Sequence, residues 1–258
     1  ASPTRALEFS SLMQGKKINW WAEGRVDTLN RYTDGELQLL RDGGCRLVFM
    51  GAESGDNEIL QRYRKGETFR APDTLTLAAR FRKAGIIPEL SFVLGFPEKD
   101  LSLAWEKLQR EIRFIRELKA INPAAEVILY VYSPVPGAGS GPDEIARQAG
   151  LEFPKTLEEW LEPEWKQFDL RKDPGTPWFT PQMARYVKNV KTVLDSAFPS
   201  VSDFRLRGIR KRLLTLPGKV RYRLGWYRYP LELQFLQKIL NYLPPEKEGF
   251  YAEECTGS

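Results

Sequence analysis

The residues with the clearest potential for binding chemistry are a carboxylate and a hydroxyl, Glu53 and Ser54, within the segment Gly51–Gly55. The apolar run Leu47–Met50 comes just before them and predicts a short buried strand, and Asp56 opens a helical pattern. In folds built on parallel strands, side chains at the carboxyl end of a buried strand commonly contact ligands. We therefore expect Glu53 and Ser54 to contribute to a ligand-binding site.

Three other expected strands end in polar or Gly/Pro-bearing turns, which are Glu23–Asp27, Gly95–Pro97 and Ser133–Gly137. Because a parallel sheet places all its carboxyl ends at one edge, these turns and the Glu53 turn should lie together. The sequence therefore predicts one shared ligand-binding edge. The alternative is that they are ordinary surface loops, which are polar in most proteins.

The composition excludes several kinds of chemistry. The chain has no histidine, so it contains no Ser-His-Asp or Cys-His nucleophile system and no zinc site with imidazole ligands. General acid–base chemistry would have to come from Glu, Asp, Lys or Tyr. The two cysteines, Cys45 and Cys255, are far apart, which gives no disulfide framework and no metal-ligand spacing, and favours a reducing cytoplasmic location.

Strands and amphipathic helices alternate along the first half of the chain, which predicts an α/β fold with parallel strands and right-handed crossovers. A capping box, Thr33 to Glu36, marks the start of one helix. The expected strands are 18–22, 47–50, 89–94 and 127–132, and the expected helices are 1–15, 33–43, 72–85 and 101–120.

The character of the sequence changes after Gly141, which predicts two domains, 1–140 and 141–258. The second contains Pro- and Trp-rich connections, a helix over 181–197, a strongly basic stretch over 201–230 and a final helical segment over 231–243. The net charge of the whole chain is only +5. We expect a mainly helical C-terminal extension with a polar tail that frays.

Five segments in order resemble radical S-adenosylmethionine enzymes, in particular the subgroup that often carries an N-terminal cobalamin-binding domain. They are Trp21–Asp27, Gly51–Gly55, Leu60–Gly66, Phe92–Glu98 and Tyr132–Gly137. The resemblance implies a partial (β/α) TIM-like barrel. It also implies S-adenosylmethionine, a four-iron four-sulfur cluster and cobalamin as cofactors, and flavodoxin or ferredoxin as an electron donor.

The chain lacks the CxxxCxxC motif that defines the family. A four-iron four-sulfur cluster needs three or four soft ligands in one pocket, and this chain has only two cysteines. We therefore expect an N-terminally truncated fragment in which 1–140 is the C-terminal two-thirds of the barrel. The cluster ligands, and the cobalamin domain, would then lie upstream. On this interpretation the 258 residues alone are inactive, and they supply no metal ligand.

The resemblance also assigns roles at the expected ligand edge. It places Glu53 and Ser54 against the ribose or methionyl part of S-adenosylmethionine, and Gly95 beside the adenine. It turns the strand end with Glu23 and Arg25 toward the cofactor. The alternatives are a carboxylate that stabilises a helix start, simple turn chemistry at Gly95, and a structural ion pair from Arg25 to Asp27 or Glu53. No catalytic residue is assigned.

The basic stretch 205–228 interleaves Arg and Lys with apolar and aromatic side chains. This stretch has three interpretations: it forms a solvated or interdomain face, it contacts an acidic lipid surface, or it contacts an RNA backbone. Contact with nucleic acid is the least favoured. We expect a cytoplasmic protein, with peripheral membrane contact through 205–228 as the alternative. Nothing local assigns a role to Cys255.

The family resemblance implies a 5′-deoxyadenosyl radical that modifies an unreactive carbon of a small-molecule or lipid substrate. Methyl transfer is the favoured outcome, and ring formation or another rearrangement is the alternative outcome. Two alternatives stay open. One is an RNA-modifying radical methylthiotransferase or methyltransferase, and the other is a non-catalytic α/β barrel that acts as a binding module.

Overall fold

A computed structural model describes residues 3–62, 69–133, 141–162, 165, 176–200 and 206–242. For residues 141–143 it describes the backbone only. The chain divides into two compact units, Ala1–Thr180 and Pro181–Ser258. The sequence-based domain boundary after residue 140 stays a prediction. No helix in the described ranges is long and apolar enough to cross a membrane.

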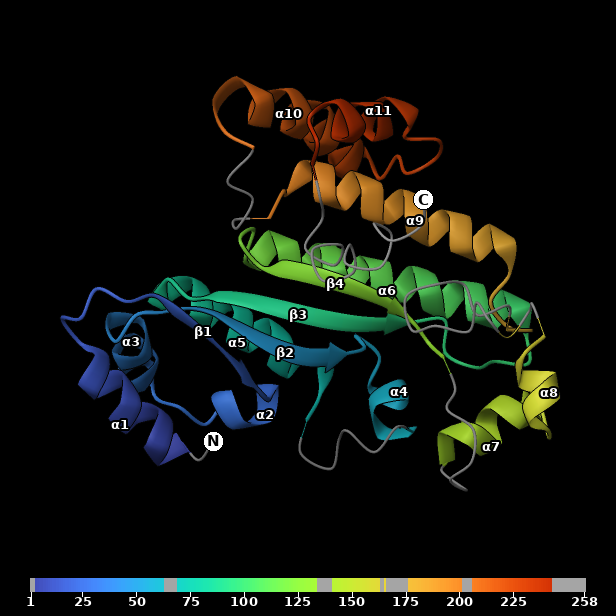
Figure 1. Cartoon of the computed structure of the whole chain (residues 1–258), viewed down its shortest axis with the longest axis horizontal. Coiled ribbons are helices and arrows are strands. Elements are labelled where there is room, and N and C mark those ends of the chain that lie inside the picture. Colours follow the sequence, from blue (N-terminus) through green and yellow to red (C-terminus); the bar gives the residue numbers. More distant parts are fainter. Residues whose placement is uncertain are drawn as a thin grey trace. The chain divides into compact units, whose positions relative to one another are not determined.

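The first unit is built on four parallel strands in the order β1-β2-β3-β4 (Figure 1). They are β1 (Trp20–Gly24), β2 (Cys45–Glu53), β3 (Ile87–Leu94) and β4 (Glu126–Val131). All four strands coincide with apolar runs in the sequence, so the predicted α/β fold with a parallel sheet is confirmed. β2 is longer than expected, because it continues through Glu53, which pairs with Phe92 after a shift in register.

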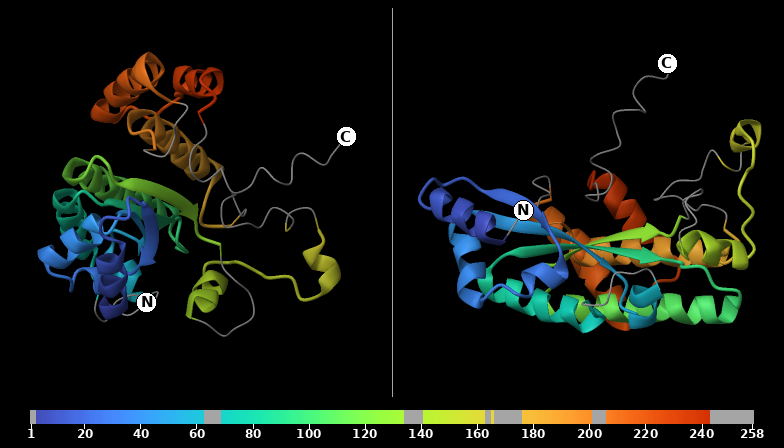
Figure 2. Two further views of the ribbon diagram at one scale, coloured as in Figure 1. Left: turned by 60° about the vertical axis from the view of Figure 1, so that its left-hand side comes forward. Right: turned by 90° about the horizontal axis from the view of Figure 1, so that it is seen from below.

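The helices of this unit are α1 (Pro3–Met13), α2 (Val26–Leu29), α3 (Asp34–Asp42), α4 (Asn57–Arg62), α5 (Ala71–Ala84), α6 (Leu101–Ile121), α7 (Gly141–Gln148) and α8 (Leu157–Trp160). Figures 1 and 2 show α5 and α6 side by side along one face of the sheet. The strand period of two puts Leu90, Phe92 and Leu94 of β3 on that buried face. Burial of alternate apolar side chains against the helices therefore holds this layer together.

Hydrogen bonds from side chains fix the ends and connections of these helices. The Arg80 guanidinium of α5 donates to Asp34 Oδ1 over 2.8 Å, to the Asn30 carbonyl over 3.0 Å, and to the Tyr32 carbonyl. This locks the α2–α3 connection onto α5. The predicted capping box also forms, since Glu36 N–H donates to Thr33 Oγ1 and Thr33 N–H donates to the Glu36 carboxylate.

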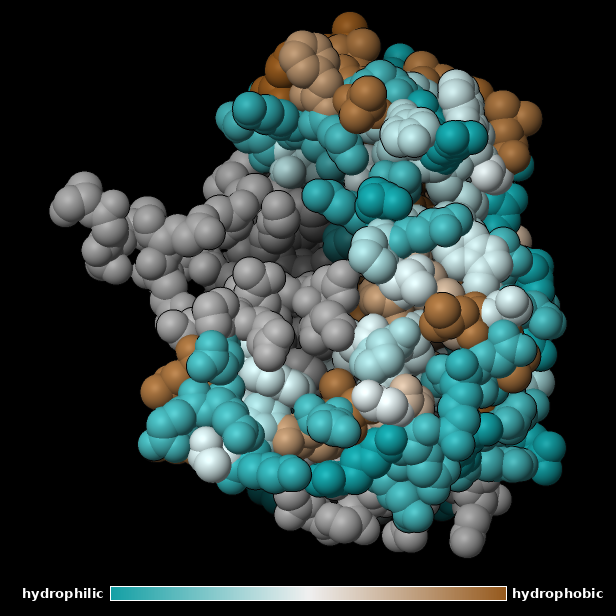
Figure 3. Space-filling view, turned by 90° about the vertical axis from the view of Figure 1, so that its right-hand side faces the viewer, coloured by the Kyte–Doolittle hydropathy of each residue, from teal (hydrophilic) through white to brown (hydrophobic). Residues whose placement is uncertain are grey.

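The second unit contains α9 (Pro181–Ala197), α10 (Gly208–Leu224) and α11 (Leu231–Ile239), and α9 and α11 coincide with expected helices. Most of the basic stretch is α10, a helix that continues through Pro217 and was not predicted. Proline disfavours a helix interior, because it removes one N–H donor and crowds the preceding turn. Hydrophobic residues gather over α10 and α11, shown in brown at the top of Figure 3.

The α1–α3 contact gives a direct test of this packing. A Cβ atom at Gly43, which ends α3, would overlap the backbone of Ser10 in α1. We expect Gly43→Ala to lower the free energy of unfolding by about 1–3 kcal/mol, because the two helices must move apart. Gly35→Ala on the same helix has room for the methyl group and should be neutral or stabilising by about 0.5–1 kcal/mol. Urea denaturation followed by circular dichroism measures both, and equal effects would contradict the packing.

Candidate functional site

The carboxyl end of β2 presents Glu53 in an unusual backbone conformation. Its φ of 63° lies in the left-handed region, and the register of β2 against β3 shifts between Gly51 and Glu53. A non-glycine residue adopts this conformation only when its surroundings hold it there. The side chain folds back along the strand, so its carboxylate lies where a side chain on Gly51 would be. The turn therefore directs a carboxylate over the sheet edge.

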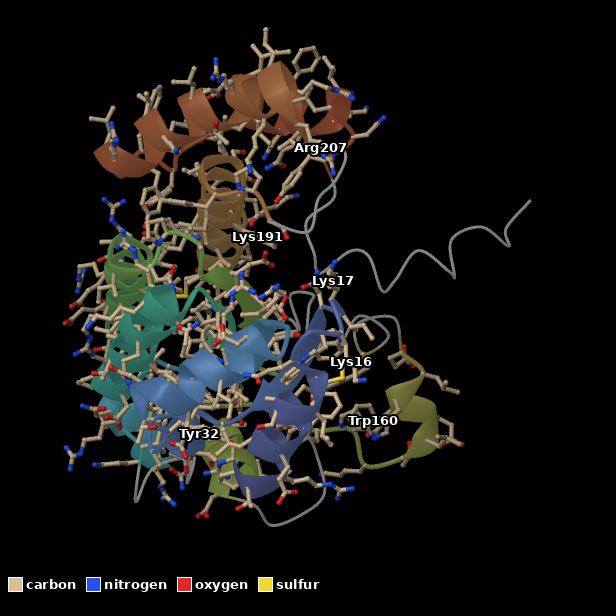
Figure 4. The ribbon with its side chains drawn as sticks, turned by 90° about the vertical axis from the view of Figure 1, so that its left-hand side faces the viewer. Lys16, Lys17, Tyr32, Trp160, Lys191 and Arg207 are labelled. Carbon is tan, nitrogen blue, oxygen red and sulfur yellow. The ribbon has the colours of Figure 1, made fainter. Side chains whose placement is uncertain are left out.

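Glu53 and Arg25 line one cavity of about 110 Å³ between the ends of β1 and β2. The cavity brings together two of the turns that the sequence predicted at a shared edge, and its wall consists of Gly24, Arg25, Val26, Asp27, Gly51, Glu53 and Phe69. Glu23 borders a second cavity of about 420 Å³, which Arg25 and Tyr32 also line (Figure 4 labels Tyr32). Three predicted site residues thus lie in two adjoining hollows.

Arg25 is engaged with its neighbour Asp27. The guanidinium donates to both carboxylate oxygens, with Nε–Oδ1 at 3.0 Å and Nη2–Oδ2 at 2.9 Å. This hydrogen bonding holds the pKa of Asp27 below its ordinary value. The Arg25 side chain is 72% exposed, so solvent screens the pair and its stabilising effect is small. The structural ion pair is therefore the contact that this chain makes, and it orients Arg25 at the cavity.

Ser54 does not line either cavity. It is fully buried, and its hydroxyl contacts the carboxylate of Glu111 from α6. The other oxygen of Glu111 accepts the Gly55 N–H over 2.8 Å, and Ser54 Oγ accepts the Asp56 N–H over 2.9 Å. In this chain Ser54 holds the turn that positions Glu53, while direct contact of Ser54 with a cofactor stays a prediction.

Burial of Glu111 changes its protonation. The side chain is 3% exposed, and loss of hydration raises its pKa from 4.5 to about 7, although the Gly55 and Ser54 hydrogen bonds oppose that shift. Near neutral pH the group is therefore divided between a carboxylate that accepts from Ser54 and an acid that can donate to it. The sequence held a signal for this residue, because Glu111 falls at helical spacing between the buried Leu108 and Ile115.

Further charged groups on α6 secure the neighbouring loops. Lys107 lies 2.7 Å from Glu98, which follows β3, and 3.9 Å from Glu58 in α4. Arg110 lies 3.7 Å from Asp56. These contacts join α6 to the turns after both β2 and β3, so one helix positions two parts of the expected ligand edge. From the sequence alone α6 is an amphipathic helix, with no role assigned to these charged groups.

Gly95 follows β3 with a φ of 71°, which favours glycine. A Cβ atom there would lie 2.5 Å from the ring of Phe179, and the Gly95 carbonyl accepts a hydrogen bond from Trp178 Nε1 over 2.8 Å. Because Gly95 has no side chain, an aromatic ring can approach its backbone closely, and in this structure that ring is Phe179. The role of Gly95 beside an adenine stays a prediction.

The described residues contain no group of three or more His, Cys, Asp or Glu side chains that could hold a metal ion. Cys45 is fully buried, and burial raises the pKa of its thiol to about 12, which opposes the thiolate form that ligates iron. Cys255 lies outside the described residues. The part of the chain that the structure describes does not fit an iron–sulfur cluster.

Sequence comparison finds one relevant relative. No protein-family model matches the chain. The uncharacterized methyltransferase PH0819 of Pyrococcus horikoshii is 29% identical over 116 residues, which are 44% of this chain and 23% of the relative. The chain thus spans about a quarter of the length of the curated relative that it matches.

Structure comparison finds similar solved structures. The cobalamin-dependent S-adenosylmethionine radical enzyme OxsB, with aqua-cobalamin and S-adenosylmethionine bound, superposes with a TM-score of 0.50 at 13% identity. The match covers 93% of this chain and 40% of that one. The radical S-adenosylmethionine methyltransferase TsrM from Kitasatospora setae gives 0.49 at 16% identity, covering 93% of this chain and 49% of that one. The likeness to OxsB concerns the fold.

The raised pKa of Glu111 predicts how stability depends on pH. Between about pH 4.5 and pH 7 the folded chain retains a proton that the unfolded chain has lost, so stability falls as the pH rises through this window. The decline should be on the order of 3 kcal/mol and should stop above about pH 7. Denaturant unfolding of the wild type and Glu111→Gln across this range measures it. The amide cannot titrate, so its stability should fall less, and parallel curves would contradict the assignment.

Proposed function

We propose that this chain is the S-adenosylmethionine-binding part of a radical S-adenosylmethionine enzyme. The observation that carries the proposal is the left-handed Glu53 at the carboxyl end of β2, which lines a cavity together with Arg25 at the end of β1. Parallel α/β folds bind ligands at this edge. The ordered sequence resemblance and the fold shared with OxsB support the same assignment.

Glu53 is suited to bind the hydroxyl groups of a ribose or a cationic amino group. These groups donate hydrogen bonds, and an ionised carboxylate is purely an acceptor. Ser54 and Glu111 hold the turn below it. On this proposal Arg25, oriented by Asp27, faces the carboxylate of the cofactor, and Glu23 lines the adjoining cavity. Gly95 is assigned to the adenine side of the cofactor.

The iron–sulfur cluster of the family would have to come from residues outside this sequence, since the 258 residues contain only Cys45 and Cys255. We therefore assign no step to the cluster in this chain. Cobalamin is likewise proposed only for a region beyond it. The part played by these residues is to bind and orient the cofactor and to exclude water from it.

The proposed reaction is methyl transfer to an unreactive carbon of a small-molecule or lipid substrate. PH0819 is described as a methyltransferase, which supports this outcome over rearrangement. We propose a flavodoxin or ferredoxin as the electron donor and a cytoplasmic location, which the low cysteine content favours. A non-catalytic binding module is the second candidate, favoured by the lack of a metal-ligating group among the described residues.

Binding of S-adenosylmethionine to the 258-residue chain tests the first part of the proposal. Isothermal titration calorimetry should detect binding, and Glu53→Gln should weaken it roughly 10- to 100-fold, because a hydrogen bond to a charged group is lost. Glu106→Gln on the exposed surface of α6 makes the same chemical change elsewhere and should leave the affinity intact. Equal affinities for both variants would exclude Glu53 from the site.

The radical reaction needs a separate test with the natural polypeptide that contains these residues. After anaerobic reconstitution with iron and sulfide, we expect it to release 5′-deoxyadenosine from S-adenosylmethionine, measured by chromatography. The 258-residue chain treated in the same way should release none, because its two cysteines cannot supply the three thiolate ligands that the cluster needs. Cofactor binding without any 5′-deoxyadenosine from the natural polypeptide would favour the binding module.

A further inference from the structure

The second unit presents two rows of exposed apolar side chains. Five residues of α10 recur on one side of the helix and are 52–74% exposed: Ile209, Leu213, Leu216, Val220 and Leu224. Three residues of α11 recur every four positions and are 56–65% exposed: Leu231, Phe235 and Ile239. Such spacing places each set on one helix face. We call these eight residues the apolar rows.

The residues of the apolar rows do not form the core of this unit, which is built by other faces of α10 and α11. Leu214 of α10 is fully buried in a cluster with Leu206, Leu240 and Tyr242, and Leu233 of α11 is also fully buried. In α10 the buried face includes Leu214, Gly218 and Arg221, at a spacing that lies opposite the exposed row. The helix is thus apolar on two sides, and packing within the unit uses only one of them.

Cations line the exposed row of α10. Arg212, Lys219 and Arg223 are exposed and follow one another at intervals of seven and four, so they form a row roughly 80° around the helix from the apolar one. Over 206–242 the chain has a single acidic residue, Glu232. The basic residues of this range are Arg207 (labelled in Figure 4), Arg210, Lys211, Arg212, Lys219, Arg221, Arg223, Arg228 and Lys238.

Arg221 both neutralises Glu232 and fixes the α10–α11 connection. Its side chain is 5% exposed, it contacts both oxygens of Glu232, and it donates to the carbonyls of Trp226, Arg228 and Tyr229, each over 3.1 Å. The guanidinium also stacks 4.0 Å from the centre of the Trp226 ring. The connection is therefore held in place with Trp226 and Tyr229 exposed by 55% and 64%.

We propose that α10 and α11 bind the surface of an anionic phospholipid bilayer. The apolar rows would enter the boundary between headgroups and acyl chains, and the Arg212–Lys219–Arg223 row would contact the phosphates. Tryptophan and tyrosine, here Trp226 and Tyr229, favour this interfacial depth. The helices would lie in the plane of the surface.

The charge pattern distinguishes this occupant from two others. A second copy docked on the same face would bring like charges together, and the one carboxylate of the region is already bound to Arg221. An RNA strand would favour aromatic stacking platforms, whereas most of the exposed apolar side chains on α10 and α11 are aliphatic. An anionic lipid surface supplies both an apolar layer and negative charge.

Vesicle flotation of the 258-residue chain tests the proposal. The chain should float with vesicles of phosphatidylcholine and phosphatidylserine, remain unbound with phosphatidylcholine alone, and lose binding as salt is raised. The triple variant Arg212→Gln, Lys219→Gln and Arg223→Gln should lower the partition coefficient about 100-fold, or about fivefold for each cation. The variant Leu213→Gln, Val220→Gln and Phe235→Gln should lower it about tenfold or more, because apolar burial in the bilayer is lost.

A matched control removes three exposed cations elsewhere, by Lys83→Gln, Lys99→Gln and Arg113→Gln, and should float like the wild type. All substituted side chains are exposed, and unchanged thermal unfolding will verify that each variant folds. A wild-type chain that does not float with anionic vesicles would overturn the proposal. Equal losses in the control and the Arg212 variant would overturn it too, as would a dimer that only the Leu213 variant dissociates.

Discussion

The candidate site depends on one buried contact, between Glu111 of α6 and the turn that follows β2. A carboxylate removed from water must be protonated or surrounded by donors, and Glu111 has both the Gly55 N–H and the Ser54 hydroxyl. The contact ties the longest helix of the first unit to the end of a central strand. Since the backbone of Glu53 lies in the left-handed region, a fixed turn on its carboxyl side is what keeps its side chain over the sheet edge.

The rest of the ligand edge is organised by the same means. Lys107 and Arg110 extend the contact of α6 to the loops that carry Glu98 and Asp56, and Arg25 is oriented by Asp27. At Gly95 an aromatic pair, Trp178 and Phe179, closes on the end of β3. In each case a group that could bind a ligand is held by a neighbour, which is how a preorganised site lowers the entropy lost on binding.

The second unit uses a buried cation where the first uses a buried acid. Arg221 satisfies the carbonyl groups of the α10–α11 connection and pairs with Glu232, so no charge is left unmatched in the interior of this unit at that point. The apolar rows lie outside this arrangement. Over 206–242 the one acidic residue, Glu232, is paired with the buried Arg221, and the other basic residues are exposed, so this part of the unit has a positive exterior that attracts anionic partners.

The sequence by itself determined the strands and most of the helices, because apolar periodicity is a local property of the chain. Of the four turns expected at one edge, two line a common cavity, and most of the turn Ser133–Gly137 lies outside the described residues. The resemblance to a family assigned ligand roles to Glu53, Arg25 and Gly95, and these roles stay predictions. Only the tertiary structure decided the directions of the side chains: Ser54 turns inward to Glu111, Arg25 pairs with Asp27, and Phe179 covers Gly95. These contacts join residues whose distance in space is not encoded in their spacing along the chain. For the same reason α10 was missed, since packing on α9 outweighs the local cost of Pro217.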